Sequence, residues 1–190
     1  MPRKSSKTLT PEDWIKTAFR NLAVHGAPSL KAEVLARQLA TTKGSFYWHF
    51  KDVPAFKREM LRLWEAEATS NIMQTVMASP AQGSARLRML AQIVSQMNAA
   101  NDYGGLLAEP GIREWARHDR QAANALRKVD HARIAFVAGL FLALGQDGDT
   151  SRAKAELFYG GFVGLQALAA VSPLNVEQRM TELLDRLLTD

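Results

Sequence analysis

The 190-residue sequence contains no cysteine. Without a thiol, the chain can form no disulfide, bind no zinc through thiolates and use no cysteine nucleophile. Long apolar runs are missing as well, because the longest, Ile134 to Leu144, is well short of the roughly 20 residues that a membrane-spanning helix needs. Residues 1–10 are basic and polar with no apolar stretch behind them, which is not the pattern of a secretory signal peptide. We therefore expect a soluble, cytoplasmic protein.

Catalytic groups are also scarce. The chain has four histidines, which show neither the i, i+4 pairing nor the clustering of a metal site: His25, His49, His118 and His131. Lys43-Gly44-Ser45 has residue types that end a phosphate-binding loop, but no glycine-rich turn or strand comes before it. We expect no enzyme activity, no metal and no cofactor. An α-helical enzyme is the least favoured alternative.

Strand patterns are absent too. No stretch alternates apolar and polar residues over any length, and neither repeats nor low-complexity segments occur. Apolar residues recur instead at helical spacing, which predicts an all-α protein of about nine helices. After residue 51 the expected helices run over 52–77, from Ser84 to about Met97, in a short piece ending near His118, from Asp119 to Leu144, from Thr150 or Ser151 to about Val171, and from Asn175 onward.

One stretch, residues 42–50, combines two kinds of side chain. Phe46 and Phe50 lie four residues apart, so on a helix they share one face and can be buried together. The remaining surface carries hydroxyl, aromatic and basic groups: Thr42, Lys43, Ser45, Tyr47, Trp48 and His49. Such groups suit DNA, because hydroxyls and Lys bind phosphates or base edges and rings contact thymine methyl groups. The alternative is a buried aromatic helix with a polar edge.

The preceding segment favours the DNA interpretation. Residues 30–39 have an amphipathic pattern, and Ala40-Thr41 makes a tight connection to the next helix. Two short helices joined in this way form a helix-turn-helix. Residues 35–52, LARQLATTKGSFYWHFKD, resemble the DNA-binding signature of the TetR family of bacterial transcriptional regulators. Ala40 stands where that family usually has a turn glycine, and Glu33 where some members have a basic residue.

The resemblance is strong over residues 10–65 and looser beyond, and it implies a ligand-responsive DNA-binding regulator. Residues 1–51 would form the helix-turn-helix domain, and residues 52–190 a ligand-binding and dimerisation domain, with the helix over 52–77 connecting them. The implied DNA-binding residues are Thr42, Lys43, Gly44, Ser45, Tyr47, Trp48, His49 and Lys51. The implied partner is a palindromic double-stranded operator, and repression is the common mode of the family. The alternative is a helical adaptor that binds a protein through its exposed aromatic helix.

Charge is divided unevenly along the chain. Residues 1–58 hold 11 Lys and Arg against 4 Asp and Glu, whereas residues 59–190 hold 13 against 15. A basic segment joined to a nearly neutral one is typical of a small nucleic-acid-binding domain attached to another domain. The positive charge thus coincides with the segment that carries the helix-turn-helix pattern.

Two segments near the C-terminus are more apolar than ordinary surface helices. Residues 134–144 are apolar on all sides, and Gly160 and Gly164 lie four residues apart, which lets another helix approach closely. A single-subunit core would explain both, but the resemblance favours a homodimer. The expected interface residues are Phe141, Leu144, Gly160, Gly164 and Leu168.

The resemblance also implies a pocket for a small-molecule effector. Methionine and aromatic side chains suit an adaptable apolar cavity. The expected lining residues are Met60, Trp64, Met89, Met97, Trp115, Phe136, Phe158 and Phe162. Plain core packing is the alternative for each of them. The expected effector is a hydrophobic or aromatic compound.

Overall fold

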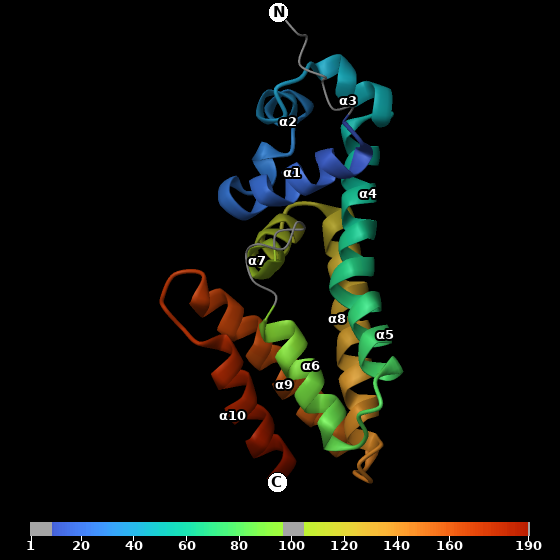
Figure 1. Cartoon of the computed structure of the whole chain (residues 1–190), viewed down its shortest axis with the longest axis vertical. Coiled ribbons are helices and arrows are strands. Elements are labelled where there is room, and N and C mark those ends of the chain that lie inside the picture. The colour runs from blue at the N-terminus through green and yellow to red at the C-terminus, as the bar shows by residue number, and fades with distance from the viewer. Residues whose placement is uncertain (1–8, 97–104, 190) are drawn as a thin grey trace, which may run out of the picture.

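The computed structural model describes residues 9–96 and 105–189. Within these ranges the chain is built of helices alone, which confirms the predicted all-α class. The helices stack along one long axis, with α2 and α3 at one end and the C-terminus at the other (Figure 1). None of the described helices is both long and apolar enough to span a bilayer.

The helices in chain order are α1 (Pro11–His25), α2 (Ala32–Gln38), α3 (Lys43–His49), α4 (Val53–Glu65), α5 (Asn71–Ala78), α6 (Ser84–Ser95), α7 (Gly105–Ala116), α8 (Arg120–Leu142), α9 (Gly148–Ala169) and α10 (Val176–Thr189). A 3-10 turn, η1 (Ala27–Ser29), follows α1, and a π-helical segment, η2 (Ala66–Ser70), joins α4 to α5. Because α4, η2 and α5 run on as one rod, the described residues form nine helices, as predicted.

Capping residues set most helix starts. Asp52 and Asp119 cap α4 and α8 as expected from the sequence: Asp52 accepts one backbone N–H of the first turn and Asp119 accepts two. The expected start of α9 at Thr150 or the next residue is wrong. Asp147 is the cap, since its Oδ1 accepts the Thr150 N–H at 2.9 Å, and the helix begins at Gly148.

The turn between α2 and α3 has an unusual backbone. Ala40 has φ = 51°, the left-handed region, and it is the one residue other than glycine with a positive φ in the described ranges. Its N–H donates to the Arg37 carbonyl at 3.2 Å, and the Thr41 N–H donates to the Ala36 carbonyl at 2.9 Å. These two bonds form a Schellman motif, which closes α2 and turns the chain toward α3.

Apolar side chains gather in two cores. The first holds α1 to α4 together and also takes Ile112 and Trp115 from α7. The second joins α5, α6, α8, α9 and α10 around Phe141 and Met180. The expected domain boundary after residue 51 falls in the connection between α3 and α4, and the first core extends across it.

Helix α7 lies directly beneath α1 (Figure 1). The two helices pack tightly at Gly111, where an added Cβ would lie 3.0 Å from Leu22 Cγ and 3.1 Å from the Leu22 carbonyl oxygen. That carbonyl also accepts the Gly26 N–H at the end of α1. The helix-turn-helix end therefore rests on α7 through an almost direct contact between backbones.

Candidate DNA-binding surface and ligand cavity

Helix α3 is anchored by its aromatic face. Phe46 is fully buried, and its ring centroid lies 5.4 Å from that of Trp14 and 5.2 Å from that of Phe56, both with edge-to-face geometry. Phe50, 7% exposed, completes the cluster. Aromatic rings attract one another at these separations. The inward placement predicted for Phe46 and Phe50 is confirmed.

The other face of α3 lies open to solvent. Trp48 is 81% exposed and Tyr47 46%. Thr42, Lys43, Gly44 and Lys51 are also exposed, while Ser45 and His49 are half-buried. The structure thus brings all eight predicted residues together around one surface, and the alternative of a buried aromatic helix is wrong. Exposed rings of this size on a surface normally mark an interaction site.

Gly44 has no internal packing reason to be glycine. In the described chain, the nearest atom to an added Cβ would be Thr42 Oγ1 at 3.6 Å, an ordinary contact distance. Glycine weakens a helix by up to about 1 kcal/mol relative to alanine, so folding alone would favour alanine here. The missing side chain leaves a shallow notch on the exposed face of α3.

Lys43 does not stand alone on this surface. Its ammonium group forms an ion pair with Glu33 of α2 and lies 5.8 Å from the ring centroid of Tyr47. The hydrogen bond from Lys43 lowers the pKa of the Glu33 carboxyl. A phosphate that binds Lys43 would therefore have to compete with Glu33.

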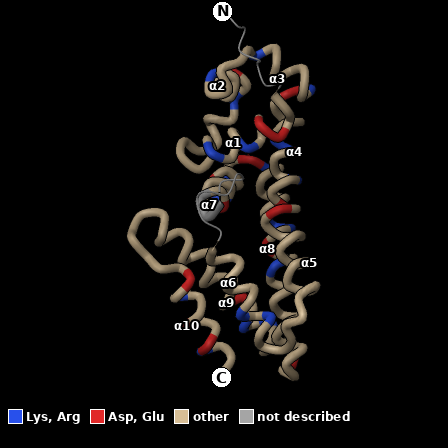
Figure 2. Tube along the Cα trace, viewed as in Figure 1, with Lys and Arg blue, Asp and Glu red and all other residues tan. Residues whose placement is uncertain are grey.

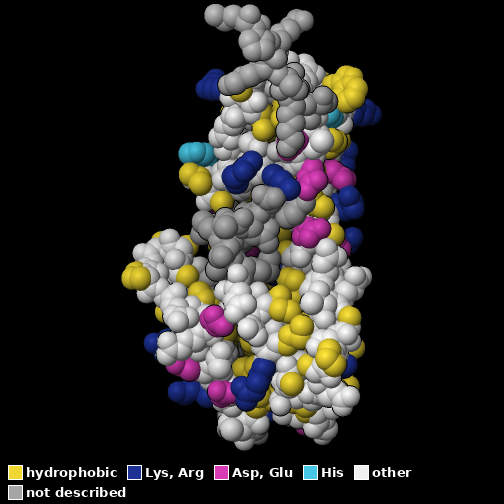
Figure 3. Space-filling model, in the orientation of Figure 1, with side chains coloured by type: hydrophobic (Ala, Val, Ile, Leu, Met, Phe, Trp, Pro, Cys, Tyr) yellow, Lys and Arg dark blue, Asp and Glu magenta, His cyan; other side chains and the backbone are white. Residues whose placement is uncertain are grey.

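Basic residues cluster at the same end of the molecule. Lys and Arg occur on α1, α2 and α3, at the end of the molecule that carries α3 (Figure 2). In the space-filling view, hydrophobic side chains reach the surface over α3 with Lys and Arg close by (Figure 3). The surface thus combines positive charge with exposed aromatic rings, which is the combination that nucleic acids bind.

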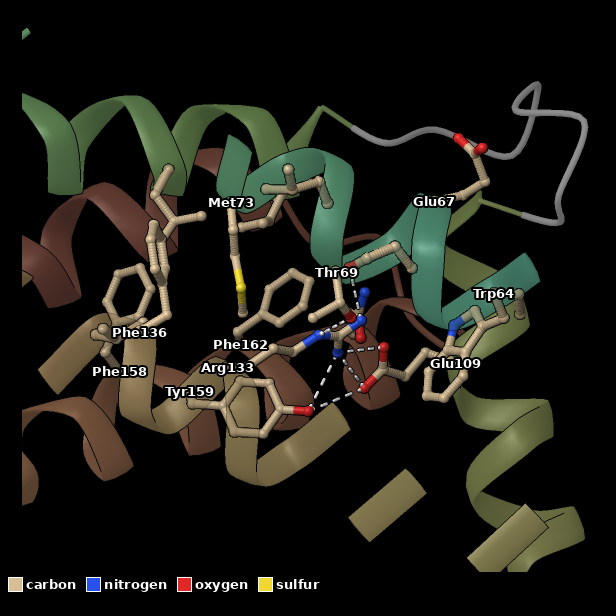
Figure 4. A pocket seen from close by; sticks show the side chains of 17 residues that line it. Trp64, Glu67, Thr69, Met73, Glu109, Arg133, Phe136, Phe158, Tyr159 and Phe162 are labelled. Atoms are coloured by element: carbon tan, nitrogen blue, oxygen red, sulfur yellow. Dashed lines mark hydrogen bonds and ion pairs between the residues drawn. The ribbon is translucent and has the colours of Figure 1, made fainter. Parts of the chain in front are cut away.

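A cavity lies where the two cores meet. About 70 Å³ of it can hold the centre of a water-sized sphere, and the whole space between its lining atoms, open solvent included, is about 850 Å³. Its walls come from α4, η2, α5, α6, α7, α8 and α9. The apolar lining includes Trp64, Ile72, Met73, Leu90, Val94, Phe136, Val137, Phe158 and Phe162, and the polar lining includes Thr69, Glu109, Arg133, Tyr159 and Gln166. In Figure 4, Met73, Phe136, Phe158 and Phe162 lie together at an apolar end, whereas Thr69, Glu109 and Trp64 lie close to the Arg133 guanidinium at a polar end.

Arg133 is the centre of the polar end. Its Nη1 donates to both oxygens of Glu109, at 2.9 and 2.7 Å. Its Nε donates to Thr69 Oγ1 at 3.1 Å, and its Nη2 to the Ala68 carbonyl at 2.9 Å. The last two acceptors belong to the π-helical segment η2, and such segments often occur at functional sites. Arg133 thereby ties α7, α8 and the rod together.

A second arginine extends this network toward solvent. Arg113 donates to Glu109 at 2.8 Å and to Asp130 at 2.7 Å. The Tyr159 hydroxyl donates to Asp130 Oδ1 at 2.6 Å and accepts from Arg113 and Arg133. Burial would lower the pKa of Arg113, but the bond to Asp130 and the charge of Glu109 outweigh it and raise the pKa. Burial and the Glu109 charge likewise raise the pKa of Tyr159, which therefore stays neutral.

Half of the expected lining residues lie on this cavity: Trp64, Phe136, Phe158 and Phe162. Met60 and Trp115 do not, although they are buried in the same first core as Trp64, and Met89 is half-buried outside the cavity wall. Met97 lies outside the described residues. For these side chains, apolar character alone did not distinguish core from cavity.

The polar lining was missed by reasoning from the sequence. A usable signal was present. Glu109 and Arg113 lie four residues apart on α7, and Asp130 and Arg133 lie three apart on α8, so each pair lies on one side of its helix. Oppositely charged residues on the face of a helix that also carries buried apolar residues often pair inside a protein. Tyr159 gave no comparable signal, because a single tyrosine among apolar residues also fits a plain core.

No family model and no curated protein sequence matches the chain. Solved structures do match it. A TetR transcriptional regulator from Legionella pneumophila has a TM-score of 0.78 at 12% identity, with 98% of each chain covered. The fold is that of the TetR-type regulators. NemR of E. coli in its reduced form has a TM-score of 0.75 at 17% identity, covering 93% of this chain and 94% of its own.

A third structure with this TetR-type fold was solved with a small molecule. It is assigned as a transcriptional regulator from Saccharomonospora viridis and is in complex with choline. Its TM-score is 0.78 at 15% identity, and the match covers 95% of this chain and 96% of that one. At these identities the likeness concerns the arrangement of the helices.

In this TetR-type fold, α8 and α9 leave an apolar face uncovered. On α9, Leu157 is 61% exposed and Leu168 57%, and an added Cβ at Gly160 or Gly164 would have no atom of the described chain within 4 Å. On α8, Leu142 is 54% exposed. Gly160, Gly164 and Leu168 therefore lie where a partner could reach them.

Two of the expected interface residues lie elsewhere. Phe141 is fully buried in the second core and cannot present its side chain to a partner, and Leu144 is half-buried against that core. The all-apolar run over 134–144 turns one side inward to its own subunit. Its exposed side consists of Ala135, Gly139, Leu142 and Ala143.

Proposed function

We propose that this protein is a ligand-responsive DNA-binding transcriptional regulator, most simply a repressor. The observation that carries the proposal is the exposed face of α3, where Tyr47, Trp48 and the Gly44 notch lie outward from a buried aromatic anchor. Residues 1–51 would read the DNA, and residues 52–190 would bind the effector and dimerise. The TetR-type fold supports this division of roles.

The interface roles follow from position. Lys51 binds phosphate, and Lys43 does so once it is released from Glu33. Thr42, Ser45, Tyr47 and His49 contact phosphates or base edges, and Trp48 packs on a sugar or a thymine methyl group. Gly44 lets the sugar–phosphate backbone approach α3 closely.

A homodimer would present two such surfaces to one duplex. The uncovered faces of α8 and α9, centred on Gly160, Gly164 and Leu168, supply the self-complementary patch that a two-fold interface needs. Two reading helices spaced about one turn of DNA apart would then read a palindrome. The cavity between the cores is the proposed effector site, since it touches the rod as well as α7.

Selection of bound sequences from a random duplex pool tests the proposal, and we expect a palindromic consensus. Binding should weaken with salt, with a log–log slope of about −0.9 for each neutralised phosphate. Gly44→Ala should lower operator affinity while leaving thermal stability equal or slightly higher. Trp48→Ala should lower affinity by about 1–3 kcal/mol.

Two matched variants serve as controls. Gly148→Ala alters a glycine at the start of α9 with no atom of the described chain within 4 Å, and Val24→Ala trims an apolar side chain on α1 that is 72% exposed. Neither should change operator affinity. A protein adaptor would show no salt-dependent DNA binding. An unchanged operator affinity in both Gly44→Ala and Trp48→Ala would show that α3 does not contact the DNA.

A further inference from the structure

The ionised groups at the polar end of the cavity balance one another. Glu109 accepts hydrogen bonds from both Arg133 and Arg113, and Asp130 accepts them from Arg113. The network thus holds two cations and two anions. Glu67, the remaining acidic lining residue, is half-exposed and points away from the aromatic side chains (Figure 4). The cavity therefore offers no unpaired buried charge to a ligand.

Arg133 fills the place that a cationic ligand would take. Its guanidinium carbon lies 5.6 Å from the ring centroid of Trp64 and 5.7 Å from that of Tyr159. Aromatic sites bind ammonium ligands through these same ring faces. A second cation would meet the positive charge of Arg133 and find Glu109 already bonded to two arginines.

An anionic ligand meets the opposite difficulty. To reach Arg133 it would have to displace Glu109, which is 5% exposed and bonded through both oxygens. Breaking a buried ion pair leaves an uncompensated charge, and this is strongly unfavourable. Both signs of charge are therefore disfavoured by the pairs within the protein.

One polar lining group lacks a partner. Gln166 is 6% exposed. Among the described lining residues, its Oε1 is the one buried side-chain nitrogen or oxygen atom with no hydrogen-bond partner. It lies one turn after Phe162 on α9 and lines both this cavity and an adjoining hollow that Arg113 and Val163 also line. A buried acceptor without a donor raises the free energy of the empty cavity, and a ligand that donates to it removes this cost.

We propose that the cavity binds an uncharged, largely apolar compound with one hydroxyl or N–H donor, of the class of phenyl-substituted alcohols. The ring packs among Phe136, Phe158 and Phe162, and the donor bonds to Gln166 Oε1. The inference rests on the proposed function, because it takes this cavity to be the effector site. The proposed ligand is uncharged and so differs from choline, the ligand of the structural neighbour from Saccharomonospora viridis.

Titration calorimetry on the full-length protein tests this with four probes that share one carbon skeleton. They are 4-phenylbutan-1-ol, 4-phenylbutanoate, 4-phenylbutylammonium and butylbenzene. We expect the alcohol to bind most tightly. Both charged probes should bind at least about 100-fold more weakly, because each would have to disrupt a buried ion pair or remain unpaired.

Variants locate the site and the donor. Gln166→Leu should lower the affinity for the alcohol about 10-fold and leave the affinity for butylbenzene unchanged. The thermal stability of the protein should stay the same or rise, because an unpaired polar atom is removed. Met73→Trp should fill the cavity and weaken every probe. Gln121→Leu, at an exposed glutamine of α8, should change nothing.

Equal or tighter binding of a charged probe would overturn the inference, as would the absence of binding by all four. Unaltered alcohol affinity in Gln166→Leu would remove Gln166 from the site. Operator binding is measured on the same preparation. If operator binding fails while the alcohol still binds selectively, the regulator proposal falls and the ligand preference stands.

Discussion

Ala40 occupies a backbone conformation that suits glycine. A left-handed residue with a Cβ costs roughly 1–2 kcal/mol, and the greater flexibility of glycine in the unfolded chain offsets part of this. Ala40→Gly should therefore raise the free energy of unfolding by about 0.5–1 kcal/mol, measured by thermal unfolding followed by circular dichroism. Arg37→Gly, in the right-handed part of α2, should instead lower it by about 1 kcal/mol. A lower melting temperature in Ala40→Gly would show that this turn is not strained.

The ion pair between Glu33 and Lys43 predicts an effect on DNA affinity. In Glu33→Gln the ammonium group of Lys43 is released to bind phosphate, so non-specific duplex binding should strengthen. The log–log salt slope should steepen by about 0.9 for each additional phosphate contact. Glu114→Gln, which removes an α7 carboxylate that is paired at 3.5 Å with Arg117 just beyond the helix, is the control. An identical slope in Glu33→Gln and the native protein would show that Lys43 makes no phosphate contact.

At the residue scale, the sequence predicted which side of α3 is buried, but it did not predict the ion pair between Lys43 and Glu33. The four-residue spacing of Phe46 and Phe50 is enough to assign an inner face, and Trp48 then falls outside. The pairing of Lys43 with Glu33 depends on how α2 and α3 cross, which is set by the Ala40 turn. Helical periodicity holds no information about that crossing.

Among the elements, α7 packs against backbone atoms of α1 at Gly111. A methyl group at residue 111 would lie within 3.1 Å of a carbonyl oxygen that is already fixed by the Gly26 N–H. Gly111→Ala should therefore destabilise the protein by about 1–3 kcal/mol, even though alanine is the better helix former. Chemical denaturation checks this, with Gly148→Ala as the uncrowded comparison. A gain in stability for Gly111→Ala would mean that α1 and α7 separate easily.

Element boundaries were predictable where a side chain closes the helix. Asp52 and Asp119 cap α4 and α8 as expected. Asp147 was overlooked because Thr150 and Ser151 are also good capping residues, and only the bond to the Thr150 N–H decides between them. The π-helical η2 has no comparable signature, since Ala66–Ser70 reads as ordinary helix.

For the whole molecule, the decisive prediction is dimerisation through α8 and α9. Leu157→Glu with Leu168→Glu places charges on the uncovered face, so light scattering at micromolar concentration should give the mass of one chain, against two for the native protein. Val24→Glu, on an equally exposed site of α1, should remain dimeric. Operator affinity should fall in the double variant, because each half-site is then bound separately. A native mass of one chain would contradict the dimer.

The overall architecture followed from periodicity, whereas the cavity did not. Trp64, Phe136, Phe158 and Phe162 were expected at its wall and lie there, yet Met60 and Trp115, which have the same apolar character and share the first core with Trp64, do not. Whether a buried side chain faces a neighbour or an empty space depends on the packing of seven elements at once. Local sequence does not encode that distinction.

The first core crosses from the reading helices into α4 and α7, and this limits how such regulators can be recombined. A chimera spliced after residue 51 would separate Phe46 from Phe56 and set a foreign α7 against Leu22. To exchange operator specificity between proteins of this architecture, α4 should be transferred together with α1 to α3, and glycine should be kept at position 111. A splice after residue 51 would leave the α1–α7 and α3–α4 contacts between side chains from different proteins.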